Sequence, residues 1–431
     1  MKKKLVSLLL ASAMVASLAA CGGTSTDETN GGSDNSSKSG TEIRIVNGKI
    51  EIDEALKAIA KTYEEETGVK VTIESMGGGV DIQGQIKAYY QAGNMPDLFV
   101  IGGAGDFANW TDEVADLGDC AFAADTDMAY TTEDGTVVGF PYAVEGYGIT
   151  YNANILEAAG VDPATLTNYA AYEAAFAKID SMKDELGIDA VCSVAAESSQ
   201  MYWSTGNHIF GYYLSGGVDR DNKDLFNLAC EGKFDEDRLA QFGKFYELLC
   251  KYSDQEVLIT GTYDDQLGKW ANGKTAFITQ GNWIDASLAD YNVEFDCGIA
   301  PLAFTEEDMT GVLASSPSWW CAYKDSKNLD EAKAFLDYLA TSEAGQKCLV
   351  TDCGMVSPYK SCTLVPETPL AKSLKTYIDA GDTYAWDWSN LKEGVAQRCL
   401  GPIFWSYANG DLTNEQFVSM MGSEMTKYVA E

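Results

Sequence analysis

Tryptophan and carboxylate side chains are the residues of this sequence best suited to hold a small molecule. An indole offers a flat apolar face, and a carboxylate accepts hydrogen bonds in fixed directions. Together they suit two kinds of ligand, a ring covered with hydroxyls or an organic cation. The chain has nine tryptophans. Those near polar turns or near one another are Trp283 after Gly281-Asn282, the pair Trp319 and Trp320, and Trp386 and Trp388 on either side of Asp387.

Histidine is nearly absent, which excludes several kinds of catalytic site. His208 is the only histidine, so a zinc site of the HExxH type, which needs two imidazoles, is ruled out. A Ser-His-Asp triad would have to use His208, but residues 206–210 show no nucleophile-elbow pattern. A single histidine beside apolar residues is typical of a structural position. These histidine-based sites are therefore excluded or disfavoured. We expect no catalytic residue, no metal and no cofactor.

Charge and composition limit the remaining functions. The 65 acidic residues outnumber the 30 basic ones and give a net charge of −35 at pH 7. Such a surplus repels phosphate backbones and anionic headgroups, which disfavours nucleic-acid binding and attachment to membranes by charge. With 431 residues and 46% hydrophobic side chains, the chain is long and apolar enough to form more than one domain with its own core.

Strand and helix patterns alternate along the chain and indicate an α/β fold. A strand–helix–strand–helix–strand order at the start forms, through right-handed crossovers, a parallel sheet covered by helices. Further amphipathic helices extend the pattern into a second domain, with a cleft between the two. The predicted strands cover residues 43–46, 69–73 and 98–101, and the predicted helices 53–67, 81–92, 169–183, 239–251 and 329–342.

Glycine-rich loops follow each of the three predicted strands. Ligands of open parallel sheets lie beyond the carboxyl ends of the strands, where glycine permits close backbone approach. One edge of this domain is therefore a predicted binding rim, although tight turns explain the same glycines. None of the loops matches the phosphate-binding motifs GxxxxGK[ST] or GxGxxG. The candidate ligand-contacting residues of the rim are Asn47, Gly78 and Asp106.

The first 20 residues have the features of an export signal. Three lysines precede an uncharged apolar run over residues 5–18, which is too short to span a bilayer. The run ends in Leu18-Ala19-Ala20-Cys21, which resembles the lipobox of bacterial lipoproteins. The resemblance implies lipidation of Cys21 and an anchor in the outer face of the bacterial cytoplasmic membrane; an ordinary signal peptide with a chance cysteine is the alternative. The polar residues 22–41 form a predicted flexible linker.

The chain has 11 cysteines, and those other than Cys21 form no CxxC pair. Their spacing leaves their disulfide state open.

Six further segments, spread over nearly the whole mature chain, contain short motifs, and the order of these motifs along the chain is informative. They are Met95-Pro96-Asp97-Leu98, residues 139–148 continuing to Tyr151-Asn152, residues 160–163, residues 272–277 with Gly281-Asn282-Trp283, residues 299–302 and residues 354–358. In this order, behind a lipobox, they resemble the extracellular solute-binding proteins of ABC importers, in particular the sugar-binding family that includes maltose-binding protein.

The resemblance implies a two-lobed α/β fold of the type II periplasmic-binding-protein kind. Each lobe is expected to be a mostly parallel sheet flanked by helices, with crossing segments that act as a hinge and a carbohydrate in the cleft. It also implies a monomer that is not an enzyme and that delivers its ligand to the permease subunits of an ABC transporter. The expected lobes are residues 42–148 with 297–328, and residues 149–296 with 329–431.

The resemblance also implies which residues reach the cleft. Trp283 ends a glycine-rich turn that often presents an aromatic ring to the sugar, and Trp386 and Trp388 lie where the second lobe completes the cleft. Glu145 and Tyr147 lie in the crossing segment 141–151, where Glu145 is either a ligand for sugar hydroxyls or a salt-bridged hinge residue. Neighbours on a strand point to opposite sides, so at most one of Trp319 and Trp320 faces the cleft; Trp320 is the candidate.

Two other functions stay open from the sequence. Acidic and aromatic residues also suit a cationic solute such as a polyamine or a peptide. A glycoside hydrolase would need two carboxyl groups roughly 5 to 10 Å apart, but no motif singles out such a pair.

Overall fold

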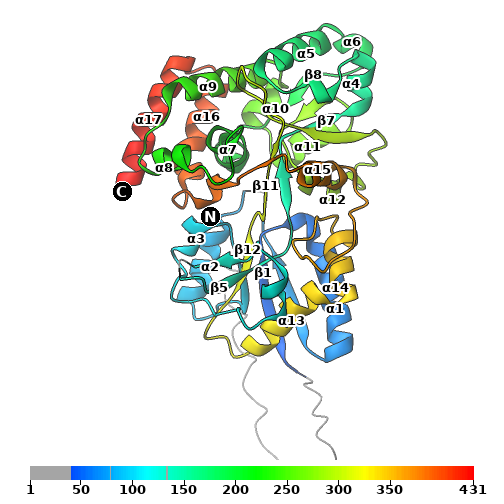
Figure 1. Cartoon of the computed structure of the whole chain (residues 1–431), viewed down its shortest axis with the longest axis vertical. Helices are drawn as coiled ribbons and strands as arrows, with labels where there is room; N and C mark the ends of the chain where they lie inside the picture. Colours follow the sequence, from blue (N-terminus) through cyan, green and yellow to red (C-terminus); the bar gives the residue numbers. More distant parts are fainter. Residues whose placement is uncertain (1–39, 78, 133) are drawn as a thin grey trace, which may run out of the picture. The chain divides into compact units, whose positions relative to one another are not determined.

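The computed structural model describes residues 40–77, 79–132 and 134–431 (Figure 1). The predicted export signal, Cys21 and nearly all of the predicted linker lie outside the described residues, and so does Gly78. Buried apolar side chains form two separate cores in the described part of the chain, so the chain has two lobes. No helix in this part is long and apolar enough to cross a membrane.

The first lobe is built on a six-stranded mixed sheet. Helices α1 (Asp53–Thr67), α13 (Leu329–Thr341) and α14 (Glu343–Lys347) lie on one side of it, and α2 (Ile82–Gln91) and α3 (Ala104–Phe107) on the other (Figure 1). The strands run in the order β2 (Lys70–Ser75), β1 (Glu42–Asn47), β3 (Leu98–Ile101), β12 (Trp319–Ala322), β5 (Val137–Pro141) and β4 (Tyr130–Thr131). β1 is parallel to β2 and β3, as predicted, whereas β12 is antiparallel to both of its neighbours.

The sequence pattern of α1 explains its position against this sheet. Leu56, Ile59 and Tyr63 are buried on one stripe, and Gly68 ends the helix with a left-handed φ of 75°. The predicted bounds of the helix are confirmed. Asp53 is the first residue of the helix and pairs with Lys57 at 2.6 Å.

The second lobe contains a four-stranded sheet and most of the helices. Its strands run in the order β10 (Cys297–Ala300), β7 (Ile149–Asn152), β9 (Thr275–Ile278) and β8 (Ala190–Ser193), and only β8 and β9 are parallel. The sheet is less parallel than expected because β7 enters the lobe and β10 leaves it, in opposite directions. The helices are α4 (Ala153–Ala159), α5 (Tyr169–Ser181), α6 (Lys183–Leu186), α7 (Phe210–Ser215), α8 (Asp224–Cys230), α9 (Glu236–Lys251), α10 (Gln255–Thr260), α11 (Tyr263–Ala271), α12 (Asp285–Leu288), α15 (Pro369–Ala380), α16 (Gly401–Ala408) and α17 (Asn414–Ala430).

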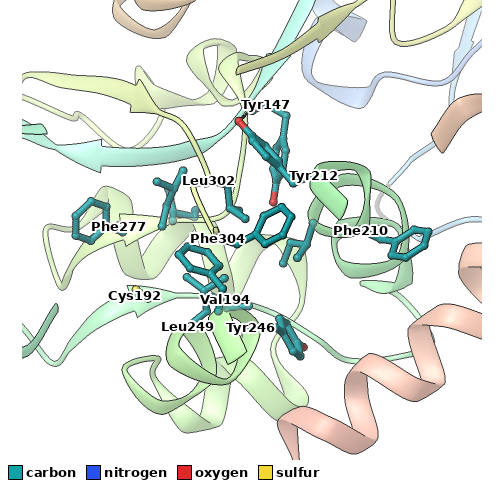
Figure 2. Packing of buried hydrophobic residues seen from close by; sticks show 14 of the residues in the cluster. Tyr147, Cys192, Val194, Phe210, Tyr212, Tyr246, Leu249, Phe277, Leu302 and Phe304 are labelled. Carbon is teal, nitrogen blue, oxygen red and sulfur yellow. Dashed lines mark hydrogen bonds between the residues drawn. The ribbon is translucent and has the colours of Figure 1, made fainter. Parts of the chain in front are cut away.

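Aromatic rings fill the core of the second lobe and extend it to the crossing segments. Figure 2 shows Tyr147 beside Tyr212, and Phe277 and Phe304 belong to the same cluster. The Tyr212 hydroxyl donates a hydrogen bond to the Tyr147 carbonyl at 3.0 Å. This core therefore holds the chain at the point where it enters the second lobe.

Three crossing segments join the lobes. A small third sheet holds two of them, with β11 (Val312–Ser315) between β6 (Glu145–Tyr147) and β13 (Thr383–Tyr384). The first segment links β5 to β7 through β6, and the second links β10 to β12 through β11. The third follows Val356, whose carbonyl accepts a hydrogen bond from the Val144 backbone at 2.8 Å, and leads to α15.

The third crossing corrects the expected lobe boundaries. Helix α13 was expected in the second lobe, but its buried Phe335, Leu336 and Leu339 belong to the core of the first. Strand β10 was expected in the first lobe, but it pairs with β7 in the second. The amphipathic pattern of α13 shows that one face is buried, but not which sheet buries it.

Candidate functional site

A cavity of about 770 Å³ lies between the two lobes, beyond the carboxyl ends of β1, β2 and β3. This volume is within the range of pockets that enclose small organic ligands. The lining comes from both lobes and from the crossing segments, so a ligand inside would contact all three. Among the described residues it comprises 48–51, 77, 79–83, 87, 100, 102, 105, 106, 145, 202, 203, 207, 208, 283, 317, 318, 388, 389 and 391–398.

Four aromatic residues form one side of the cavity, and we call them the aromatic wall: Trp203, His208, Trp283 and Trp388. The ring centroid of His208 lies 4.8 Å from that of Trp283, 5.1 Å from that of Trp388 and 5.5 Å from that of Trp203. The wall thus offers flat ring surfaces of several orientations within a small area.

Trp283 is held by the local turn that precedes it. It belongs to a short 3₁₀ helix (Asn282–Ile284) that Gly281 precedes. A Cβ on Gly281 would lie 2.2 Å from the Gly146 carbonyl oxygen and 2.3 Å from the Trp283 ring, so only glycine fits there. The Asn282 side chain accepts a hydrogen bond from the Gly146 backbone at 2.8 Å. These contacts tie the tryptophan to the crossing strand β6.

The Trp283 ring is fixed on its other sides as well. It stacks on Tyr147, with centroids 6.0 Å apart and planes within 7°. Its Nε1 donates to the Gln280 side chain at 2.7 Å, and 8% of the residue is exposed. Tyr147 itself is buried behind Trp283 and is not part of the described lining.

Glu145 and Lys49 form an ion pair in the lining. Their side chains are only 6% and 12% exposed. Burial raises the pKa of Glu145 and outweighs the opposite effect of Lys49. Burial also acts to lower the pKa of Lys49, but attraction to Glu145 and Glu51 outweighs it and raises that pKa. Glu145 therefore both lines the cavity and is salt-bridged, and its role as a ligand for sugar hydroxyls stays a prediction.

The predicted glycine rim supplies Asp106 to the cavity and Asn47 to its support. The Gly102 backbone donates a hydrogen bond to Asp106 at 2.8 Å. Burial raises the pKa of Asp106 to about 6, with a smaller opposite effect of that hydrogen bond. Asn47 is fully buried and donates to the Lys49 carbonyl at 2.6 Å, so it positions the loop that carries Lys49.

The two remaining tryptophan candidates lie outside the described lining. Trp320 is fully buried in the first core, stacked on Phe140 at 5.9 Å and on Tyr142 at 4.6 Å. This corrects its expected place in the cleft: β12 lies inside a sheet that is covered on both sides. Trp386 is buried behind the wall, 5.6 Å from Trp388 and 5.5 Å from His208 between ring centroids.

Sequence reasoning missed three prominent residues of the lining, Lys49, Trp203 and His208. Lys49 lies two residues after Asn47 in a glycine loop that was already under consideration. The run from Tyr202 to His208 combines two aromatics, an amide and an imidazole, a composition typical of a polar site rather than of a core. This composition could have identified Trp203 and His208 as candidate site residues.

Neither metal ligands nor disulfides are assembled in the described part of the chain. No group of three or more His, Cys, Asp or Glu residues there is placed to hold a metal ion. The cysteines from Cys120 to Cys399 carry free thiols.

Comparison with known proteins places this architecture in a family. Residues 58–377 match the family of bacterial extracellular solute-binding proteins. The chain belongs to this family. This match confirms the resemblance of the sequence motifs to those of extracellular solute-binding proteins. The lipid anchor at Cys21 stays a prediction.

Curated relatives of this solute-binding protein cover most of its length. A maltooligosaccharide ABC transporter solute-binding lipoprotein of Streptococcus pneumoniae strain R6 is 27% identical over 344 residues, which are 76% of this chain and 74% of the relative. The melibiose/raffinose/stachyose-binding protein MelE of Bacillus subtilis is 22% identical over 309 residues, 67% of each chain.

Solved structures confirm the two-lobed fold. A sugar transporter of Bacillus licheniformis in complex with stachyose aligns with a TM-score of 0.70 at 18% identity, over 90% of this chain and 100% of the other. The solute-binding protein RafE in complex with raffinose aligns with a TM-score of 0.74 at 18% identity, over 90% and 99% of the two chains.

Proposed function

We propose that this solute-binding protein captures a sugar of oligosaccharide size between its lobes and delivers it to the permease of an ABC importer. It acts outside the cytoplasm as a monomer tethered by a lipid on Cys21, and it releases its sugar unchanged. The observation that carries the proposal is the aromatic wall, which lines a cavity between two lobes together with charged and amide side chains. The sugars named for its relatives support the same ligand class.

The chemistry of the wall fits a sugar ring. The C–H faces of a sugar are apolar and flat enough to lie against indole, whereas its hydroxyls project outwards and need donors and acceptors. Trp283 and Trp388 offer the first kind of surface, and Asn207 and Asp106 offer the second.

The charges of the lining disfavour the cationic alternative. Two of the acidic side chains are already paired with lysines of the lining, Glu145 with Lys49, and Glu393 with Lys87 at 2.8 Å. A polyamine would have to displace these lysines or lie beside them. The described lining has four basic residues, Lys49, Lys87, Lys392 and Arg398, against five acidic ones, Glu51, Asp81, Asp106, Glu145 and Glu393.

Lobe closure accounts for capture. The Lys87–Glu393 pair joins the lobes, and the Asn109 side chain donates to Glu393 at 2.7 Å. A ligand shifts a conformational equilibrium only through its different affinity for the two states. A sugar that contacts both lobes therefore stabilises this closed arrangement over the open one, which we expect to dominate without ligand.

The proposal is tested by thermal unfolding and calorimetry with maltotetraose, raffinose, stachyose and spermidine. A ligand present at about 100 times its dissociation constant adds roughly 2.7 kcal/mol of stability. We expect one of the sugars to stabilise the protein and to be recovered intact by chromatography. Stabilisation by spermidine alone would favour the cationic alternative, and released monosaccharide would favour a hydrolase.

Trp283→Ala tests the role of the wall directly. Loss of a buried aromatic anchor costs about 2 kcal/mol or more in binding, which weakens affinity roughly 30-fold. Trp405→Ala is the matched control, because Trp405 is a half-buried tryptophan on α16 outside the described lining. Equal affinities for the two variants would contradict the stacking role of Trp283.

The anchor is tested separately. Expression in a bacterium that processes lipoproteins, with labelled palmitate, should label the wild-type protein and leave Cys21→Ser unlabelled. Label on neither protein would remove the anchor from the proposal and leave sugar binding untouched.

A further inference from the structure

The imidazole of His208 occupies the centre of the aromatic wall. Besides its neighbours in the wall, it contacts Tyr147 and Trp386, with ring centroids 5.1 Å and 5.5 Å away. The residue is 9% exposed, and it lines the cavity. Its surroundings are thus almost entirely aromatic, the environment in which a phenyl or indole ring would be the natural occupant.

One ring nitrogen of this imidazole lacks a hydrogen-bond partner in the described part of the protein. Its Nδ1 is enclosed and has no hydrogen-bond partner in the described part of the chain. An enclosed polar group without a partner opposes folding, so an apolar ring here would be more favourable for the protein alone. Because Nδ1 is enclosed, a partner in the cavity can meet only the other ring nitrogen, Nε2, on the exposed part of this residue of the lining.

The imidazole is also neutral under physiological conditions. Burial, and to a lesser extent the Lys49 ammonium, lowers the pKa of His208 to about 3. Hydrogen bonding to the backbone of Trp203 has a smaller, opposite effect on this pKa. A neutral imidazole carries one donor and one acceptor, and a hydroxyl group can pair with whichever of the two Nε2 presents, because a hydroxyl both donates and accepts.

The backbone that carries His208 is π-helical, a conformation that is common at ligand-binding and catalytic sites. Residues Ser204–Ile209 form a π-helical turn, and so do Ala396–Leu400. The two turns contact each other at Gly206, where a Cβ would lie 3.0 Å from the Ala396 Cα. Such wide turns recur at functional sites. The first turn brings Asn207 and His208 to the cavity lining.

We infer that His208 is a specificity-determining residue, whose imidazole hydrogen-bonds a hydroxyl group of a sugar ring held against Trp283. The inference rests on the proposed function and adds to it a requirement for a hydroxyl at one position of the ligand. A site built to hydrogen-bond a hydroxyl strongly rejects an analogue that lacks it, because a buried polar group is then left unpaired. His208 thus selects among sugars that the tryptophans alone would accept.

The test compares His208→Phe and His208→Met with His208→Gln by calorimetry. The probes are maltotetraose, raffinose and stachyose. Methionine is close to histidine in volume, and phenylalanine keeps a flat ring but is larger; both remove the two ring nitrogens, whereas glutamine restores a donor and an acceptor. For a sugar that the wild type binds, we expect the apolar variants to bind roughly 5- to 100-fold more weakly, and the glutamine variant to recover part of the loss.

The stability of the ligand-free variants separates a binding role from a packing role. We expect the apolar variants to unfold at the same temperature as the wild type or at a higher one, because they remove an unpartnered polar atom. Tyr263→Phe is the matched control: it removes another enclosed, unpartnered polar atom, near Trp203 but outside the described lining, and its sugar affinity should equal that of the wild type.

Each outcome decides the inference. Affinity of both apolar variants within twofold of the wild type would overturn it and leave the proposed function standing. Lower stability of both apolar variants without ligand would assign His208 to packing and overturn it as well. Failure of the wild type to bind any of the sugars would overturn the proposed function and, with it, this inference.

Discussion

Gly105 in α3 has no room for a side chain in this arrangement of the lobes, which we propose is the closed one. A Cβ on this residue would lie 2.4 Å from the Leu391 carbonyl oxygen and 2.7 Å from the Glu393 backbone nitrogen, both in the second lobe. Within α3 itself, alanine is a better helix residue than glycine. We therefore expect Gly105→Ala to leave the open form intact and to strain only the closed form.

The size of the effect follows from the severity of this contact. Backbone atoms at these distances must shift, and an added methyl group in a packed site typically costs about 1–3 kcal/mol. If sugar binds the closed form, the same free energy is lost from binding, so affinity should fall roughly 5- to 150-fold. The sugar that stabilises the wild type is the ligand for this experiment.

Calorimetry measures the affinity, and small-angle scattering with and without sugar measures the closure. Gly422→Ala is the matched control, since a Cβ on Gly422, inside α17, meets no atom within 4 Å. It should leave affinity unchanged and raise stability slightly. If Gly105→Ala bound the sugar as tightly as the wild type, α3 and the 391–393 segment would not meet in the bound state, and our description of closure would be wrong.

Three further outcomes are expected. Glu145→Gln leaves the Lys49 ammonium buried without its carboxylate and should lower the free energy of unfolding by about 3–5 kcal/mol, measured with urea. Lys87→Ala removes a partly exposed bridge to Glu393 and should weaken sugar binding less than about fivefold, with the difference shrinking at high salt. Burial raises the pKa of Asp285 from 3.8 to about 6, so the folded state binds the proton more tightly, and the free energy of unfolding should fall as pH rises from about 4 to 6. Asp285→Asn should lack this part of the slope, and an unchanged pH profile would exclude Asp285 as its source.

The elements that depend on local pattern were predictable from the sequence. Helix α1 has the predicted bounds because its apolar residues repeat at helical spacing and Gly68 stops it. The parallel order of β1, β2 and β3 follows from short crossovers of one hand. The position of the site beyond these strands follows in turn, since ligands gather at the carboxyl ends of parallel strands.

The sequence predicted correctly which candidate residues line the cavity where their position depends on neighbours in the chain. Trp283 lines the cavity as the turn at Gly281 suggested, and Glu145 does so from the predicted crossing segment. Trp320 was misplaced because its exposure depends on which elements cover β12, and these come from distant parts of the chain.

The sequence by itself determined an exported, acidic α/β chain with motifs of a binding protein, because periodicity, charge and short motifs are properties of neighbouring residues. The tertiary structure alone decided that α13 belongs to the first lobe and that His208 stands among Tyr147, Trp283 and Trp388. These residues are far apart along the chain and meet only because three crossing segments fold the two lobes against one cavity. No local pattern encodes such a meeting, since it depends on the packing of both lobes at once.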